Sequence, residues 1–248
     1  MSPTYLFILF VAGLAGGFID SIAGGGGLIT VPTLLALGLP PQLALGTNKA
    51  QSSCGTIMSV WRYGRAGLIS WPQVRLAVIL SFIASMAGAW CVTMISSTSL
   101  KAIVPWMLLA IVIYVIFSPK LGEKARTARL PLVLFSLIFG TALGFYDGFF
   151  GPGTGAFWTI ATVGLLGLEL TQATAFTKAV NLASNLGSLI IFSLKGDVLL
   201  PVVGVMVAGQ LIGTYIGAGL VLANGAVLIR RVFLGVVFAL VIKLLFLG

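Results

Sequence analysis

The chain of 248 residues is 59% hydrophobic and only 8% charged, with a formal net charge of +9 and no histidine. Because soluble domains carry about 25% charged residues, this composition excludes a soluble fold and indicates an integral membrane protein. The lack of histidine excludes a His-based zinc site or catalytic triad. The basic residues lie mainly in short connections, which is typical of a membrane protein and not of a nucleic-acid surface.

Long apolar runs predict membrane-spanning helices. Runs of 18 or more apolar residues are long enough to cross a hydrocarbon core about 30 Å thick. Barrel strands alternate between apolar and polar residues, whereas stretches such as residues 132–135 are apolar on every face. The predicted fold class is therefore all-α, a polytopic transmembrane helical bundle of about eight helices.

The first half, residues 1–119, begins with a glycine-rich apolar segment and a run of four glycines. A short apolar segment, a long polar helix and two plain apolar helices follow. We expect these elements at about 5–23, 24–27, 28–38, 41–64, 72–95 and 100–118. The basic segment 120–130 comes next, and we expect a cytoplasmic linker there because positively charged connections stay inside the cell.

The second half, residues 131–248, repeats this order of segments. Its apolar, short, polar and final helices are expected at about 131–150, 155–167, 170–194, 199–222 and 226–247. Gly17-Phe18-Ile19-Asp20 returns as Gly144-Phe145-Tyr146-Asp147, and Lys49 returns as Lys178, with a register slip of only two residues. Two hydrophobic repeats that each contain a glycine-broken segment are typical of secondary transporters.

The relative direction of the two repeats stays open. The short segments 28–38 and 155–167 either turn back as half-helices or join the next helix to cross the membrane. An even number of crossings per half gives parallel repeats, and an odd number gives inverted ones. Both arrangements leave the same number of basic residues inside, so the charge distribution does not distinguish them.

The doubled glycine break is the strongest candidate for a binding site. Each glycine costs about 0.8–1 kcal/mol relative to alanine in a helix, and non-helical backbone at membrane depth is tolerated only where protein buries it or it lines a wet cavity. The helix after each break would direct free N–H groups at an anion. We therefore expect substrate contacts near Gly25, Gly26, Gly153 and Thr154; the alternative is close helix packing.

Each long polar helix has a lysine and two polar residues on one face. Positions i, i+3 and i+7 are occupied by Lys49, Ser52 and Thr56 in the first half and by Lys178, Asn181 and Asn185 in the second. A lysine in the membrane costs at least about 2.5–3.5 kcal/mol, so it normally faces a cavity or a partner. An ammonium group beside amides and hydroxyls suits an oxyanion. The predicted substrate-binding side chains are Lys49, Lys178, Asn48, Ser52, Asn181 and Asn185. The alternative is that each lysine extends to a membrane surface.

Asp20 and Asp147 are the aligned pair among the five acidic residues. Two roles stay open for them: proton coupling, or a structural role as an ion pair with Lys49 or Lys178 or as a hydrogen-bonded cap near the broken helix. Direct contact with an anionic substrate is disfavoured, because two negative charges repel each other.

Other functional classes lack their required residues. No Gly-Lys-Ser or Gly-Lys-Thr follows the glycine runs, so nucleotide binding is excluded. Neither a nucleophile with a base nor a cluster of metal ligands is evident, so we expect no enzyme activity, no cofactor and no metal. The expected partners are a small anion, a coupling proton or cation, and the lipid bilayer; an oligomer stays possible, and nucleic acid is not expected.

The glycine-break motif and the lysine motif also carry a family resemblance. Residues 17–28, the stretch 45–49 and the repeat at 144–185 resemble the TauE/SafE family, also called the sulfite exporter or toluene sulfonate uptake permease family. The resemblance covers essentially the whole chain, and its first copy is most similar to the bacterial inner-membrane branch. It implies a multi-pass inner-membrane protein with two four-helix repeats, which favours the parallel arrangement.

The resemblance also implies organosulfur or related anions such as sulfite, sulfoacetate and sulfonates. The second copy departs from the first, since Asn48 becomes Thr177 and the four glycines become Gly151-Pro152-Gly153-Thr154, so the site is expected to be asymmetric. The resulting prediction is a secondary transporter of a small anion that works by alternating access. The alternative is a passive anion channel or pore.

Overall fold

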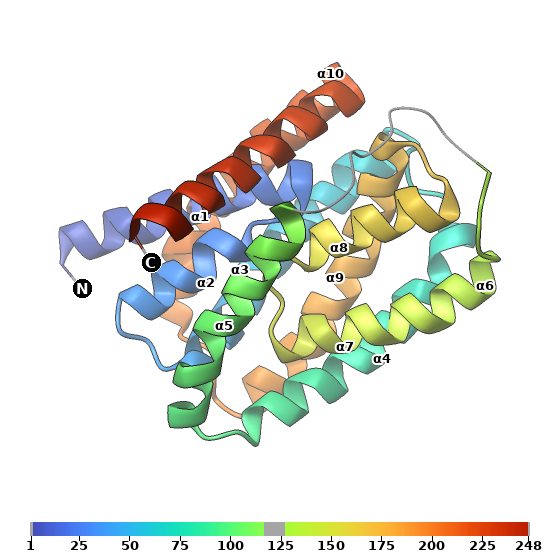
Figure 1. Cartoon of the computed structure of the whole chain (residues 1–248). Helices are drawn as coiled ribbons and strands as arrows, with labels where there is room; N and C mark the ends of the chain where they lie inside the picture. The colour runs from blue at the N-terminus through green and yellow to red at the C-terminus, as the bar shows by residue number, and fades with distance from the viewer. Residues whose placement is uncertain (1, 117–126, 248) are drawn as a thin grey trace.

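The computed structural model describes residues 2–116 and 127–247, and the regular secondary structure of this part of the chain is all helical (Figure 1). The first half contains α1 (Pro3–Ala23), α2 (Gly27–Ala36), α3 (Pro41–Arg65), α4 (Trp71–Thr93) and α5 (Ser97–Ile116). The second contains α6 (Leu132–Phe135), η1 (Ser136–Gly140), α7 (Thr141–Phe149), α8 (Thr154–Ala161), η2 (Thr162–Leu166), α9 (Leu170–Leu194) and α10 (Leu200–Leu247). The all-α class is confirmed for these residues. Most of the predicted linker 120–130 lies outside them.

Within residues 2–116 and 127–247, five helices are long and apolar enough to cross a membrane: Pro3–Ala23, Trp71–Thr93, Leu132–Phe149, Leu170–Leu194 and Leu200–Gly225. The last is the first part of α10, which bends at the non-helical Gly225. Helix α3 has the same length as α9, 25 residues, but it carries more polar side chains and does not meet the same hydropathy criterion. The sequence-based expectation of about eight membrane helices is therefore matched in part.

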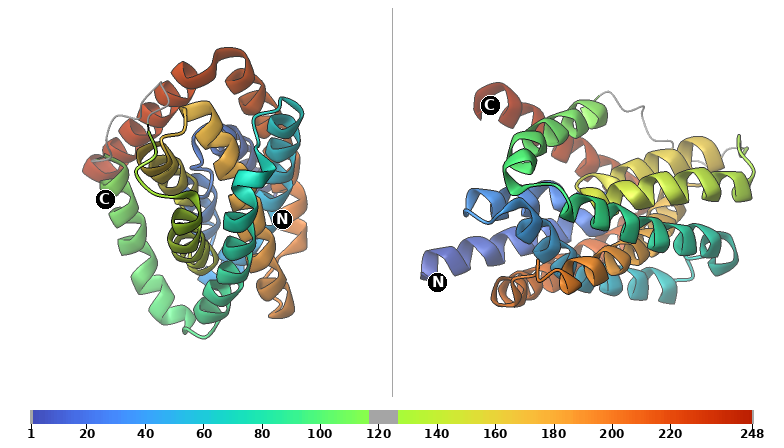
Figure 2. Two further views of the ribbon diagram at one scale, coloured as in Figure 1. Left: turned by 90° about the vertical axis from the view of Figure 1, so that its right-hand side faces the viewer. Right: turned by 90° about the horizontal axis from the view of Figure 1, so that it is seen from below.

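Helices from the two predicted halves are interleaved. Helix α1 packs along α10, and α7 with η1 packs along α4, while α3 and α9 contact each other between these pairs. Most residues of α3 and α9 are buried, and in both views of Figure 2 the red last part of α10 lies at the edge of the bundle. The two outer contacts use corresponding glycines: Gly88 on α4 lies against the backbone of Phe145, and Gly217 on α10 lies against that of Phe18. Small residues let membrane helices approach this closely.

Helices α1 and α2 form a helical hairpin, and so do α6–α7 and α8–η2. In the first hairpin, Leu9 from α1 and Leu34 from α2 share one apolar cluster with Val202 and Met206 of α10, so the two outer ends lie together. In the second, the backbone N–H groups of Arg129 and Leu130 both donate to the carbonyl of Leu165. The chain therefore enters and leaves each hairpin at the same end.

The two hairpin tips meet at the centre of the molecule. Gly24 ends α1 with a left-handed backbone, φ 74°, that a side chain would strain. A Cβ at Gly155, near the start of α8, would overlap the backbone of Gly24. In Figure 1, α1 approaches this point from the side of the N-terminus, and α6–α7 approach from the opposite side. The fold thus brings both glycine breaks to one place.

Candidate functional site

Two buried ion pairs connect the halves of the chain beside the hairpin tips. Lys49 Nζ on α3 lies 2.7 Å from Asp147 Oδ1 on α7, and Lys178 Nζ on α9 lies 2.9 Å from Asp20 Oδ2 on α1. Each lysine therefore pairs with the aspartate of the other half. Both lysines are at most 1% exposed, so neither extends to the surface.

The Asp147 carboxylate is fully surrounded by donors. Asn181 Nδ2 donates to Oδ2 at 3.0 Å, and the Ser184 hydroxyl donates to the same oxygen. The other oxygen accepts from Lys49, whose ammonium group also donates to Asn185 Oδ1 at 3.1 Å. Helix α9 thus supplies three polar side chains, at 181, 184 and 185, that hold the pair in place.

A second network ties each short helix to its neighbouring polar helix. Thr30 on α2 donates to Asn48 Oδ1 on α3 at 2.5 Å, and the hydroxyls of Thr159 on α8 and Thr177 on α9 lie 3.3 Å apart. Each pair is separated by 18 residues in sequence. Thr177 therefore occupies, in the second half, the position that Asn48 occupies in the first. Its hydroxyl keeps the contact with the threonine of the short helix.

The second glycine break lies directly against the Lys49–Asp147 pair. Gly151 has φ 96°, and a Cβ there would lie 2.9 Å from Lys49 Nζ and 3.1 Å from Asp147 Oδ1. Thr154 begins α8, and its hydroxyl donates to the carbonyl of Gly151 at 2.6 Å. This threonine therefore closes the turn, and its hydroxyl is engaged by the backbone.

A polar cavity of about 20 Å³ lies between the two ion pairs. It is lined by Asp20, Gly24, Gly27, Asn48, Lys49, Ser52, Asp147, Gly151, Gly153, Gly155, Asn181 and Asn185. A space of this size holds about one water molecule. The space is therefore too small for a polyatomic anion with the hairpin tips in this position.

Most of the residues predicted from the sequence come together here, but four do not line the cavity. Lys178 lies behind Asp20, and Gly25, Gly26 and Thr154 belong to the turns that start the short helices. The carbonyls of Gly25 and Gly26 accept from Leu28, Ile29 and Thr30. The sequence analysis missed Thr30, Thr159, Thr177 and Ser184 as site residues. The signal that could have found the threonines is their spacing, since Thr30 and Asn48 are 18 residues apart and so are Thr159 and Thr177.

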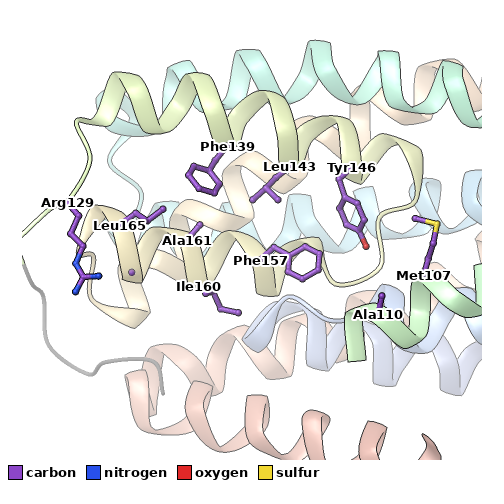
Figure 3. Close-up of a pocket in the computed structure, with 11 residues that line it drawn as sticks. Met107, Ala110, Arg129, Phe139, Leu143, Tyr146, Phe157, Ile160, Ala161 and Leu165 are labelled. Atoms are coloured by element: carbon purple, nitrogen blue, oxygen red, sulfur yellow. The ribbon is translucent and has the colours of Figure 1, made fainter. Parts of the chain in front are cut away.

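A larger cavity of about 680 Å³ lies away from these charges, between α5 and the second hairpin (Figure 3). Its walls are mostly apolar, with Phe139, Leu143 and Ile160 among them, and Arg129 lies at one end. The hydroxyl of Tyr146 in its wall already donates to the carbonyl of Pro152 at 2.7 Å. We assign the candidate site to the smaller cavity, because apolar walls suit a hydrocarbon chain better than an anion.

Metal binding has no support in the described ranges, 2–116 and 127–247. No group of three or more Cys, Asp or Glu side chains that could hold a metal ion occurs there. The charged groups at the site are two ammonium and two carboxylate groups, which form two ion pairs.

Comparisons with known proteins agree with this picture. The family described as sulfite exporter TauE/SafE matches residues 9–244. A "Probable membrane transporter protein" of Haemophilus influenzae is 42% identical over 241 residues, covering 97% of this chain and 94% of the relative. The "Probable membrane transporter protein YfcA" of Escherichia coli K12 is 42% identical over 246 residues, covering 99% and 91%, respectively.

A more distant relative, the "Probable membrane transporter protein YdhB" of Bacillus subtilis, is 26% identical over 219 residues, covering 86% of this chain and 87% of its own. No solved structure matches the chain. The family match spans nearly the whole chain, and the five candidate spans require several membrane crossings. The chain therefore belongs to the sulfite exporter TauE/SafE family of membrane transporters and is a multi-pass membrane protein.

Proposed function

We propose that this protein is a secondary transporter that moves a small anion, a sulfur oxyanion or organosulfonate, across the bacterial inner membrane by alternating access. The observation that carries the proposal is the pair of crossed Lys–Asp contacts around a closed polar cavity between two broken hairpins. The printed family description, sulfite exporter, supports the choice of a sulfur oxyanion.

The lysines are the natural anion ligands at this site. Lys49 lines the cavity. Lys178 does not line it but contacts Asp20, which does. Buried charges need a partner in a medium of low dielectric constant. In the closed state, the aspartate carboxylates bind the lysine ammonium groups in place of the substrate. An anion that enters the cavity competes with these carboxylates for the ammonium groups.

We infer that the halves are inverted repeats, and not the parallel repeats that the resemblance favoured. Each half begins with a hairpin whose ends lie together, so the hairpin does not cross the membrane. We count three crossings in each half, by α3, α4 and α5 and by α9 and the two parts of α10, which makes the number odd. In this arrangement α1 and Leu132–Phe149 enter the membrane without crossing it, although they are long enough to do so, and α3 and α5 cross although they are not among the five helices selected by length and hydropathy. The two hairpins approach the centre from opposite sides, which is the pattern of inverted-repeat transporters (Figure 1).

The orientation follows from the basic residues at the two ends of α4. Arg62, Arg65 and Arg75 lie near its beginning, at Trp71. Lys195 lies over the ring of Trp90 near its other end, 4.4 Å from the ring centre. The arginine-rich end is assigned to the cytoplasm, because cytoplasmic connections carry the excess of basic residues.

Alternating access is favoured over a passive pore by the contact between the tips. The backbones of Gly24 and Gly155 touch, and the cavity beside them has room for about one water molecule. A pore needs a continuous polar path. Here each hairpin can open the cavity to its own side while the other stays closed.

The inverted arrangement is tested by labelling introduced cysteines from each side of the membrane, in a chain whose Cys54 and Cys91 are replaced by serine. Ser70→Cys tests the connection between α3 and α4, and Lys195→Cys tests the corresponding connection between α9 and α10. We expect an impermeant maleimide to label them from opposite sides. Labelling of both from the same side would establish parallel repeats.

The anion site is tested by thermal unfolding of the detergent-purified protein with sulfite, thiosulfate, sulfoacetate, taurine, sulfate and simple carboxylates. A ligand at 100 times its dissociation constant stabilises by about 2.7 kcal/mol, which is readily detected. We expect a rise in Tm with at least one sulfur oxyanion, and none for that ligand in Lys49→Ala.

The matched control is Lys101→Ala, which removes an exposed lysine at the start of α5. This variant should keep the full ligand-induced rise. A wild-type protein that unfolds cooperatively and shows no shift with any of these anions would contradict the proposed substrate class.

A further inference from the structure

The two ion pairs differ in how firmly the carboxylate is held. Asp147 accepts from Lys49, Asn181 and Ser184, and its side chain is 2% exposed. Asp20 has Lys178 as its one side-chain partner in the described part of the chain, and its side chain is 13% exposed. Hydrogen bonds to the ionised form of a carboxylate oppose its protonation. Asp20 is therefore held by fewer donors than Asp147 and is the more exposed of the two carboxylates.

The charges at the site also restrict what can bind there. Two ammonium and two carboxylate groups sum to zero in the closed state. A monovalent anion that enters this buried site leaves an uncompensated negative charge, which is expensive in a medium of low dielectric constant. Protonation of one aspartate restores neutrality when the anion is bound.

We propose that Asp20 is the proton-coupling residue, and that one proton binds to its carboxylate with each monovalent anion. This inference rests on the proposed function as an anion transporter. A proton from water adds to a carboxylate oxygen of Asp20, and the ion pair with Lys178 is lost while Lys178 stays an ammonium group. Its positive charge is then balanced by the anion in the cavity that Asp20 lines. Loss of the proton restores the pair and expels the anion.

The groups around Asp20 are consistent with this role. Helix α9 presents Lys178, and α3 presents Lys49 and Tyr63, whose hydroxyl donates to the carbonyl of Ser21 at 2.7 Å. Helix α7 presents Asp147 across the cavity. Helix α10 contributes uncharged side chains at Gln210 and Thr214 near this part of α1, and α2 and α8 have no charged residue. Among the residues that the structure describes, Lys178 is the one cation in direct contact with Asp20.

The test is the affinity of the purified full-length protein for methanesulfonate between pH 5.5 and 8.5, measured by calorimetry. This probe stays a monovalent anion over the whole range. In the wild type, the dissociation constant should rise about tenfold per pH unit at the alkaline end, because binding takes up one proton. In Asp20→Asn, which resembles the protonated state, binding should persist with no pH dependence.

Glu169→Gln, which removes a carboxylate at the start of α9 and outside the cavity, is the matched control and should keep the wild-type slope. Proton uptake by the wild type is counted in buffers with different heats of ionisation, so the proposal does not depend on one variant folding. One proton per methanesulfonate in the wild type and in Glu169→Gln, with none in Asp20→Asn, supports Asp20 as its acceptor.

Three results would overturn the proposal: a flat pH profile in the wild type, a slope that persists in Asp20→Asn, or dependence on sodium and not on pH. Absence of methanesulfonate binding to the wild type at every pH would instead overturn the anion function on which the proposal rests. The two failures are therefore distinguishable.

Discussion

The surroundings of the two ion pairs are built on the same plan but with different numbers of contacts. Around Lys49–Asp147, α9 adds two donors to the carboxylate and one acceptor to the ammonium group. Around Lys178–Asp20, the described residues add no such side-chain contacts, and the carboxylate is partly exposed. Duplication of a segment thus preserves the charges, while the neighbouring polar side chains decide which pair is fixed and which pair is free to change.

The first and largest expected effect is on the free energy of unfolding of the lysine variants. Lys49→Ala leaves Asp147 buried without its cation, which should cost about 3–5 kcal/mol. Lys178→Ala should cost less, because water reaches the side chain of Asp20. Thermal unfolding in detergent measures both, with Lys101→Ala as the exposed-lysine control. Equal losses in the two site variants would contradict the difference between the pairs.

The second prediction concerns the donors that surround Asp147. Asn181→Ala removes a hydrogen bond to a buried carboxylate, an interaction that contributes about 1.5–3 kcal/mol. We expect a corresponding fall in Tm and a lower barrier to breaking the Lys49 pair. Asn224→Ala is the matched control, because it removes an exposed amide that bonds only within its own helix. A fall in Asn224→Ala as large as that in Asn181→Ala would show that the loss is unrelated to Asp147.

The sequence predicted the helical class, the membrane location and most of the cavity lining, because composition and helical periodicity are local properties. It did not give the crossed pairing of Lys49 with Asp147 and Lys178 with Asp20. That pairing depends on the interleaving of the two halves, which brings α7 to α3 and α1 to α9. Periodicity places a side chain on a face of its helix but does not say which helix that face meets.

The glycine breaks show the same limit. Four glycines predicted an interruption, and the structure has one, but the carbonyls of Gly25 and Gly26 are used by the first turn of α2. The local pattern identified where the helix ends. The contact between Gly24 and Gly155, which closes the cavity, comes from two segments more than half the chain apart.

The smallest expected effect compares the two threonine contacts that tie the short helices to the polar helices. Thr30→Val removes the hydroxyl that donates to Asn48 at 2.5 Å, an amide that also accepts from Gln51 at 3.0 Å. Thr159→Val removes a longer contact, 3.3 Å, to a single hydroxyl. We expect Thr30→Val to lower stability by about 1 kcal/mol and Thr159→Val by less, as measured by thermal unfolding. A larger loss in Thr159→Val would mean that the second hairpin depends more on its polar contacts than the first, because the two substitutions remove the same hydroxyl from corresponding positions.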